Sequence, residues 1–468
     1  MKRAGLLLIA ILSMQALSAQ HHQDHPSRKD SSRVREEIHS FKEFFTHGHW
    51  GGHLRNYFML TSHTGPFETK YANAIGMKVD FVTARFKGFE MGIGGIFTFD
   101  AFSSDLSVRD PFAGRYPAFE LQLFDIEDPE NKYDLDRLED LYLAYNFGKA
   151  SRVVYGRQHI ETPFVNPTDG RMKPYAFQGF NFEFNELEKT RMQALWITHV
   201  SPRSTVEWYS LEESLGVYSQ GFTPAGDTAH YHEHVSSGGL AIIGVEHSFN
   251  KNLKAQGWYY HAENLLQTFY GRVETEVALN ADFSLYGGVE TVIQEKAGNG
   301  GNPQDDFTYV CPGDQSRVFG GQIGAKYAGF DLSFNALALN DQGRFLFPRE
   351  WGRENFFATV SRGRLEGTGD GELYNLRLKK DFSDRLSAQV DYLRYDGPGW
   401  NTFEFNKYGI ADYDQFNLEL CYHFHRWFEG LDVRFLYVHK AAREEVPAEI
   451  VYYQSNFNHF NVITNFTF

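Results

Sequence analysis

The sequence predicts an all-β fold, a transmembrane antiparallel β-barrel of about 18 strands with short periplasmic turns and long extracellular loops. Three observations lead to this prediction. Segments of about ten residues alternate between apolar and polar side chains, which is the length that crosses a bilayer at barrel tilt. Short turns alternate with long polar segments along the chain. The last alternating segment ends on an aromatic residue, Phe468.

The composition excludes several other classes of protein. A chain that is 42% hydrophobic and 16% aromatic is too rich in apolar residues to be intrinsically disordered. The net charge of −15 argues against nucleic acid as a partner, because phosphate binding needs clustered Lys and Arg. Cys311 and Cys421 lie too far apart for a disulfide framework or a metal site, and no cofactor is expected.

The first residues have the order of a secretory signal peptide. Lys2 and Arg3 precede the apolar run 6–12, and small residues follow at Ala16, Ser18 and Ala19. We expect a signal peptide over 1–19, a periplasmic lead-in over 20–51 and the barrel over 52–468. Seven histidines fall within 21–53, so a metal-binding tail is an alternative to a solvated lead-in. No acidic or Cys partner stands at ligand spacing, and no metal site is predicted.

The alternation has period two, as expected for strands with one face in lipid and one in water. In residues 415–424, Phe416, Leu418 and Leu420 share one face, opposite Asn417 and Glu419. The same pattern runs through 140–147, 268–279, 374–379, 385–392 and 431–437.

The connections between strands are either tight or long. Eight tight turns are predicted, and eight turns imply about 18 strands if both termini lie at the turn end. The turns are Phe86–Gly88, Phe147–Ser151, Ser201–Ser204, Asn250–Asn252, Asn280–Asp282, Ala328–Phe330, Asp381–Asp384 and His425–Gly430. The largest polar segments between them run over 102–136, 161–177, 213–237, 295–316, 341–370 and 396–412. A length of 468 residues by itself suggests about three domains. With this many strands and long loops, the same length fits one large barrel.

The C-terminal strand resembles the assembly signal of outer-membrane barrels. Phe460, Val462, Thr464, Phe466 and Phe468 share one face, and the sequence ends on the last of them. We therefore expect Phe460, Phe466 and Phe468 to be recognised by the barrel assembly machinery.

The segment from Gly156 to Gly179 does not have a strand pattern. It contains three prolines, at 163, 167 and 174, and proline cannot donate to a central ladder. A barrel this wide would be an open channel unless something folds inward. This rigid segment is our candidate for the obstruction.

In this segment the sequence resembles the OprD-like family of substrate-specific outer-membrane porins. The motifs are Gly156-Arg157-Gln158, Thr162-Pro163, Asp169-Gly170-Arg171-Met172 with Pro174, and Phe177-Gln178-Gly179, joined by Leu54-Arg55-Asn56-Tyr57 and Tyr71-Ala72-Asn73-Ala74. The resemblance implies an 18-stranded barrel, diffusion of small solutes that are often carboxylates, and an inward-folded third loop. The predicted constriction residues are Glu161, Pro163, Asp169, Arg171 and Lys173.

The resemblance also implies a row of Arg and Lys along the pore. Arginine suits carboxylates because its rigid fork of donors can hold both oxygens. The candidates, by alternation, are Arg55, Arg157, Arg272, Arg377, Lys379, Arg385 and Arg434. The alternative for each is that it pairs with a lumen acid such as Glu274, Glu276 or Asp432 and only fills a polar interior.

The sequence thus predicts an outer-membrane porin, not an enzyme, for passive and selective diffusion of small hydrophilic solutes. Carboxylates are the candidate solutes, and outer-membrane lipid is the other expected partner. The oligomeric state is left open. Two other functions also stay open: a polysaccharide exporter barrel and an outer-membrane hydrolase, although no G-x-S-x-G motif occurs. A gated receptor is disfavoured because about 30 residues precede the first strand, too few for a plug domain that could fill a barrel.

Overall fold

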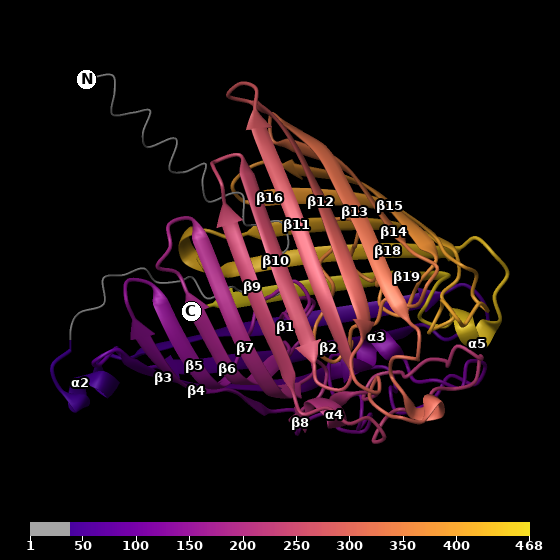
Figure 1. Cartoon of the computed structure of the whole chain (residues 1–468), viewed down its shortest axis with the longest axis horizontal. Coiled ribbons are helices and arrows are strands. Elements are labelled where there is room, and N and C mark those ends of the chain that lie inside the picture. The colour runs from indigo at the N-terminus through magenta and orange to yellow at the C-terminus, as the bar shows by residue number, and fades with distance from the viewer. Residues whose placement is uncertain (1–37) are drawn as a thin grey trace.

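The strands pair in chain order into a single closed sheet (Figure 1). In the computed structural model, which describes residues 38–468, eighteen long antiparallel strands form the barrel. They are β1 (His49–His63), β2 (Lys70–Val82), β3 (Phe89–Ser103), β4 (Arg137–Phe147), β5 (Ser151–Gln158), β6 (Ala176–Phe184), β7 (Thr190–Ser201), β9 (Leu240–Ser248), β10 (Leu253–Ala262), β11 (Leu266–Ala278), β12 (Phe283–Lys296), β13 (Gln315–Tyr327), β14 (Phe330–Leu339), β15 (Gly371–Asp381), β16 (Leu386–Asp396), β17 (Tyr413–His423), β18 (Leu431–Ala442) and β19 (Phe457–Thr467). The predicted fold class is confirmed.

The first and last strands close the barrel. β1 pairs with β19 from His53 opposite Thr467 to His63 opposite Phe457. Closure leaves no unpaired edge, which a sheet in lipid requires because no water is there to bond free backbone groups. A nineteenth strand, β8 (Tyr209–Ser210), pairs only with His199 and Val200 at the end of β7.

The short helices lie at the two ends of the barrel (Figure 1). α2 (Phe41–Thr46) precedes β1, and its N-cap Ser40 accepts a hydrogen bond from the backbone N–H of Glu43. α3 (Ala118–Leu121), α4 (Leu211–Ser214) and α5 (Ala448–Val451) lie in the long loops, as does the 3-10 turn η1 (Asp305–Phe307), whereas η2 (Arg426–Phe428) lies in a turn. Within 38–468, no helix has both the length and the apolar character needed to cross a membrane. The signal peptide expected over 1–19 lies outside the described residues.

Side chains alternate between the two faces of the wall, as predicted. In β19, Val462 and Phe466 are exposed on the outer face, while Asn461, Ile463 and Asn465 are buried on the inner face. Phe460 and Phe468 share the outer side with Phe466, and the rings of Phe466 and Phe468 lie against each other. The outer face is therefore the apolar one that a bilayer needs.

One of the predicted turns is wrong. Ser201–Ser204 does not connect two adjacent strands but opens the long segment 202–239, because Pro202 ends β7 at the long-loop end. The turn between β6 and β7 is 185–189, where Lys189 has a φ of 61°. Its sequence, Asn-Glu-Leu-Glu-Lys, lacks Gly and Pro, so the pattern did not reveal it. The two errors cancel, and the predicted strand number is correct.

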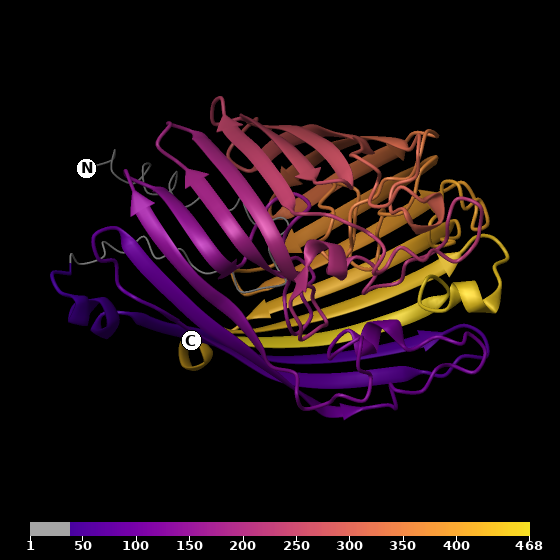
Figure 2. The ribbon, with the colours of Figure 1, turned by 60° about the horizontal axis from the view of Figure 1, so that its bottom comes forward.

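The inner face is not uniformly polar. Loop segments lie across the interior at the long-loop end (Figure 2). Together with the barrel wall they form a buried apolar core that includes Phe164, Phe345, Trp351, Phe356 and Trp258. This core lies toward the long-loop end of the interior, whereas a polar cavity is lined by other residues of the same strands, nearer the turn end.

Candidate functional site

The segment 159–175 enters the barrel between β5 and β6. Its two ends meet where His159 Nδ1 lies 3.2 Å from the carbonyl oxygen of Tyr175. Phe164 is fully buried, and its ring centroid lies 5.1–5.8 Å from the rings of five other aromatic residues: Tyr260, Tyr270, Phe345, Phe347 and Phe356. The apolar half of the segment is thus anchored to the β10–β11 side of the wall.

A second loop, 340–370, holds this segment in place. Asn166 Nδ2 donates to the carbonyl of Arg353 over 2.7 Å, and the Tyr175 hydroxyl donates to the carbonyl of Arg349 over 2.9 Å. The backbones touch at Gly352, where an added Cβ would lie 2.3 Å from the Phe164 carbonyl oxygen. Only glycine fits at this position, which also has a φ of 148°.

Four arginines surround Asp169 at the tip of the segment. Asp169 Oδ2 lies 2.5 Å from Arg203 Nη1 and 3.5 Å from Arg353 Nη1, and Oδ1 lies 3.1 Å from Arg362 Nη1. Arg171 pairs with the same Oδ1. We call Arg171, Arg203, Arg353 and Arg362 the arginine cluster. Burial lowers the pKa of Arg171, and the guanidinium groups of Arg362 and Arg203 lower it further.

The facing barrel wall also contacts the arginine cluster. Arg55 Nε donates to Asn465 Oδ1 over 2.6 Å, and its Nη1 donates to the carbonyl oxygen of Arg171. Arg362 Nη2 donates to Asn461 Oδ1 over 3.2 Å. The wall formed by β1 and β19 therefore presents a further cation and neutral amides to the cluster.

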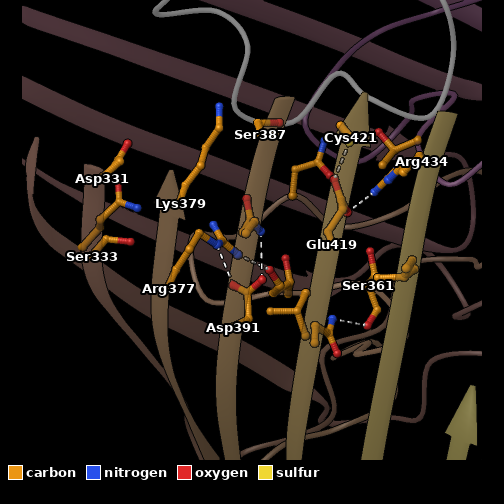
Figure 3. Close-up of a pocket in the computed structure, with 18 of the residues that line it drawn as sticks. Asp331, Ser333, Ser361, Arg377, Lys379, Ser387, Asp391, Glu419, Cys421 and Arg434 are labelled. Atoms are coloured by element: carbon orange, nitrogen blue, oxygen red, sulfur yellow. Dashed lines mark hydrogen bonds and ion pairs between the residues drawn. The ribbon is translucent and has the colours of Figure 1, made fainter. Parts of the chain in front are cut away.

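A polar cavity, which we call the vestibule, lies beside the arginine cluster. The cavity is lined by charged and polar side chains from β12 to β18 and from loop 340–370, and about 1140 Å³ of it is empty, part of it open to solvent (Figure 3). Arg377 Nε lies 2.7 Å from Asp391 Oδ1, and Arg434 Nη2 lies 2.5 Å from Glu419 Oε2. Arg434 also lines a smaller pocket that reaches Asp169 and Arg171, so the two cavities adjoin at this residue.

The structure places the predicted constriction residues unevenly. Asp169 and Arg171 form the tip, whereas Glu161 is exposed and Pro163 is half-buried. Lys173 is buried, and its Nζ donates to the carbonyl oxygen of Phe124 over 3.1 Å. Burial lowers the pKa of Lys173 to about 7, with a smaller contribution from Arg137.

Two residues of the predicted basic row are misplaced. Arg157 lies on the outer face of β5, paired with the exposed Leu141, and its guanidinium stacks over Trp208 at 4.4 Å. Tyr155 and Arg157 share this outer face, whereas Val154 and Gln158 are buried on the inner one, so a charged side chain stands here in the outward-facing set. Arg385 is exposed in the turn before β16.

The other members of the row face the interior. Arg55 and Arg434 lie beside the constriction, and Arg377 and Lys379 line the vestibule. Arg272 pairs with Glu290 at 2.7 Å and donates to the Asn355 carbonyl, so it supports loop 340–370. As the alternative reading expected, Arg272, Arg377 and Arg434 each have an acidic partner on an adjacent strand, although these are not the acids suggested by the sequence.

Three members of the arginine cluster were missed by sequence reasoning. Arg203, Arg353 and Arg362 lie in loops, where strand alternation gives no information. A usable signal is the arginine-rich stretch 349–364, in which Arg353 and Arg362 each neighbour a glycine.

Comparison with known protein families finds a match that includes the inward segment. The model of the OprD family of outer-membrane porins matches residues 148–311, which contain the inward segment. The resemblance to the OprD family is confirmed over this stretch. The motifs at 54–57 and 71–74 lie outside the matched range. No curated protein matches the chain.

Solved OprD-type structures share the fold. OccAB2 of Acinetobacter baumannii aligns with a TM-score of 0.71 at 13% identity, covering 91% of this chain and 99% of its own. Pseudomonas aeruginosa OpdK, solved with vanillate, aligns with a TM-score of 0.68 at 15% identity, and OccK8 (OprE) with 0.69 at 14%; each alignment covers 91% of this chain and 99% of the other. The family match and the closed barrel indicate a porin of the bacterial outer membrane, a passive channel and not an enzyme.

Among residues 38–468, no group of three or more His, Cys, Asp or Glu side chains could hold a metal ion.

Proposed function

We propose that this porin selects small hydrophilic anions, with carboxylates as its solute class, at the constriction made by the inward segment. The observation that carries the proposal is the arginine cluster, four cations within 3.5 Å of a single carboxylate, with Arg55 beside them. Guanidinium groups bind carboxylates through paired hydrogen bonds, and burial strengthens that attraction.

The vestibule supports selective passage and not only binding. Arg377 and Arg434 line the vestibule, each beside an acid that competes for it, and Arg434 also lines the pocket next to the cluster. A solute that meets several weak sites in sequence can enter and also leave. The arrangement therefore favours transfer from cation to cation over tight capture.

The comparison with OpdK points to the same solute class. That protein was solved with vanillate, which is an aromatic carboxylate. The identity between the two chains is only 15%, so the support for carboxylates here rests on the arginine cluster.

Reconstitution in planar bilayers tests the proposal. We expect a reversal potential that favours anions under a salt gradient, and liposomes that swell faster in benzoate than in a neutral solute of equal size. Arg362→Gln should reduce the anion preference. Arg157→Gln, which removes the same charge from the outer face, is the matched control and should leave it intact. A cation-selective channel, or none, would contradict the proposal.

A further inference from the structure

The arginine cluster already holds a carboxylate, and that carboxylate belongs to the chain itself. Both oxygens of Asp169 are engaged, Oδ1 by Arg171 and Arg362 and Oδ2 by Arg203 and Arg353. The Asp169 side chain is 11% exposed, so it is nearly enclosed by these groups. This is the coordination that a bound carboxylate solute would adopt.

The charges around Asp169 are unbalanced in favour of a second anion. Four guanidinium groups contact one carboxylate, and Arg55 lies against the Arg171 backbone. Two further acids act on the cluster: Glu354 attracts Arg353 and Glu120 attracts Arg362. Glu354 also pairs with a fifth loop arginine, Arg364, at 3.4 Å. With Arg55 and Arg364 included, six cations face three carboxylates, so the cluster keeps a positive excess when Asp169 is in place.

The backbone at Asp169 has an uncommon conformation. Asp169 and Arg171 have φ values of 57° and 51°, in the left-handed region that non-glycine residues rarely adopt. Asp is among the residues that tolerate this region best. The ion pairs hold the turn in this shape, so occupation of the cluster and the position of the loop tip depend on each other.

A small pocket beside the arginine cluster borders Asp169. The smaller pocket is lined by Asp169 and Arg171 together with Arg55 and Arg434. Arg434 belongs also to the vestibule, as do Arg353 and Thr168, the residue before Asp169. An anion that arrives through the vestibule therefore meets the arginine cluster with Asp169 already in it.

We propose that Asp169 is a tethered ligand, whose carboxylate occupies the anion site until a solute carboxylate displaces it. This inference rests on the proposed function and adds a mechanism of release. Because the tether supplies a high local concentration of carboxylate, a free acid binds more weakly than it would to the vacant cluster. The competition keeps the residence time of a solute short.

Chemical rescue tests the inference. Asp169→Gly removes the side chain, and glycine adopts the φ of 57° without strain. Acetate has the size of the missing side chain. We expect acetate, titrated against chloride at constant ionic strength in planar bilayers, to alter the single-channel current of this variant at a concentration at least about tenfold lower than in the unmodified protein, since short tethers give millimolar local concentrations.

A second variant and a control guard against misfolding. Asp169→Asn keeps the volume and removes the charge, so its relative anion permeability should rise and its response to acetate should be weaker than that of Asp169→Gly. Asp384→Asn makes the same chemical change in the exposed turn between β15 and β16 and should respond like the unmodified protein. Heat-modifiable migration on gels verifies that each barrel is folded.

The two proposals fail in different ways. If Asp169→Gly and Asp169→Asn fold and match the unmodified protein in acetate response and anion permeability, the tethered ligand is refuted. If Asp169→Gly fails to fold, an unchanged anion permeability in Asp169→Asn refutes it. Absence of anion selectivity in the unmodified channel contradicts the proposed function, whereas an acetate response confined to Asp169→Gly still supports the tethered ligand.

Discussion

Phe164→Ala should release the inward segment from the barrel wall. The side chain is fully buried among five aromatic rings, and no polar group of its own would be lost. Truncating a buried Phe to Ala costs about 3–5 kcal/mol, which shifts the docking equilibrium of the segment by about a hundredfold or more. Because the barrel wall is closed by its own backbone hydrogen bonds, we expect the loop to move while the barrel persists.

The assay is single-channel conductance together with liposome swelling by solutes of graded size. We expect a higher or noisier conductance and entry of larger solutes. Phe180→Ala, at an exposed outer-face position in β6, is the matched control, since it removes the same side chain outside the lumen. If Phe164→Ala forms a folded channel with unchanged conductance and size limit, the segment does not constrict the pore and the reasoning fails.

Three further predictions concern the constriction, the loops and assembly. Arg171→Ser should widen solute acceptance in swelling assays, and an unchanged solute profile would count against a selective role for the tip. Burial lowers the pKa of Lys407 to about 8, below its ordinary 10.5. Between these two pH values the folded loops bind fewer protons than the unfolded ones, so their stability, measured as resistance to chymotrypsin, should increase with pH. Lys407→Met should flatten this increase, and an identical slope in both proteins would refute the prediction. Phe468→Ala should reduce the folded barrel recovered in the outer membrane, whereas Phe382→Ala, exposed in a turn, should not; equal recovery would contradict the assembly signal.

The barrel could be predicted because strand parity is a local property. In β19, the alternation of Val462 and Phe466 with Asn461 and Asn465 assigns both faces without reference to any other strand. The prediction failed where residue type does not match position. Arg157 is charged but lies on the outer face with Tyr155, and a turn without Gly or Pro at 185–189 was not recognised.

The candidate site could be predicted only in part. The prolines around Asp169 and Arg171 marked a segment that could not be a strand, and this segment does enter the barrel. Nothing local reveals that Arg203, Arg353 and Arg362 converge on Asp169, because they come from two other loops and meet it only after folding.

Alternation along each strand was enough to predict the barrel, and the prolines marked 161–177 as a segment that could not be a strand. The barrel follows from backbone hydrogen bonding in lipid and from period-two patterning, which act between neighbouring residues. Only the tertiary structure shows that the apolar half of this segment, at Phe164, packs into a core at the long-loop end of the interior. Only the tertiary structure shows that Asp169, in the polar half, lies among arginines from distant loops. Contacts between loops depend on where closure of the barrel brings the loops together.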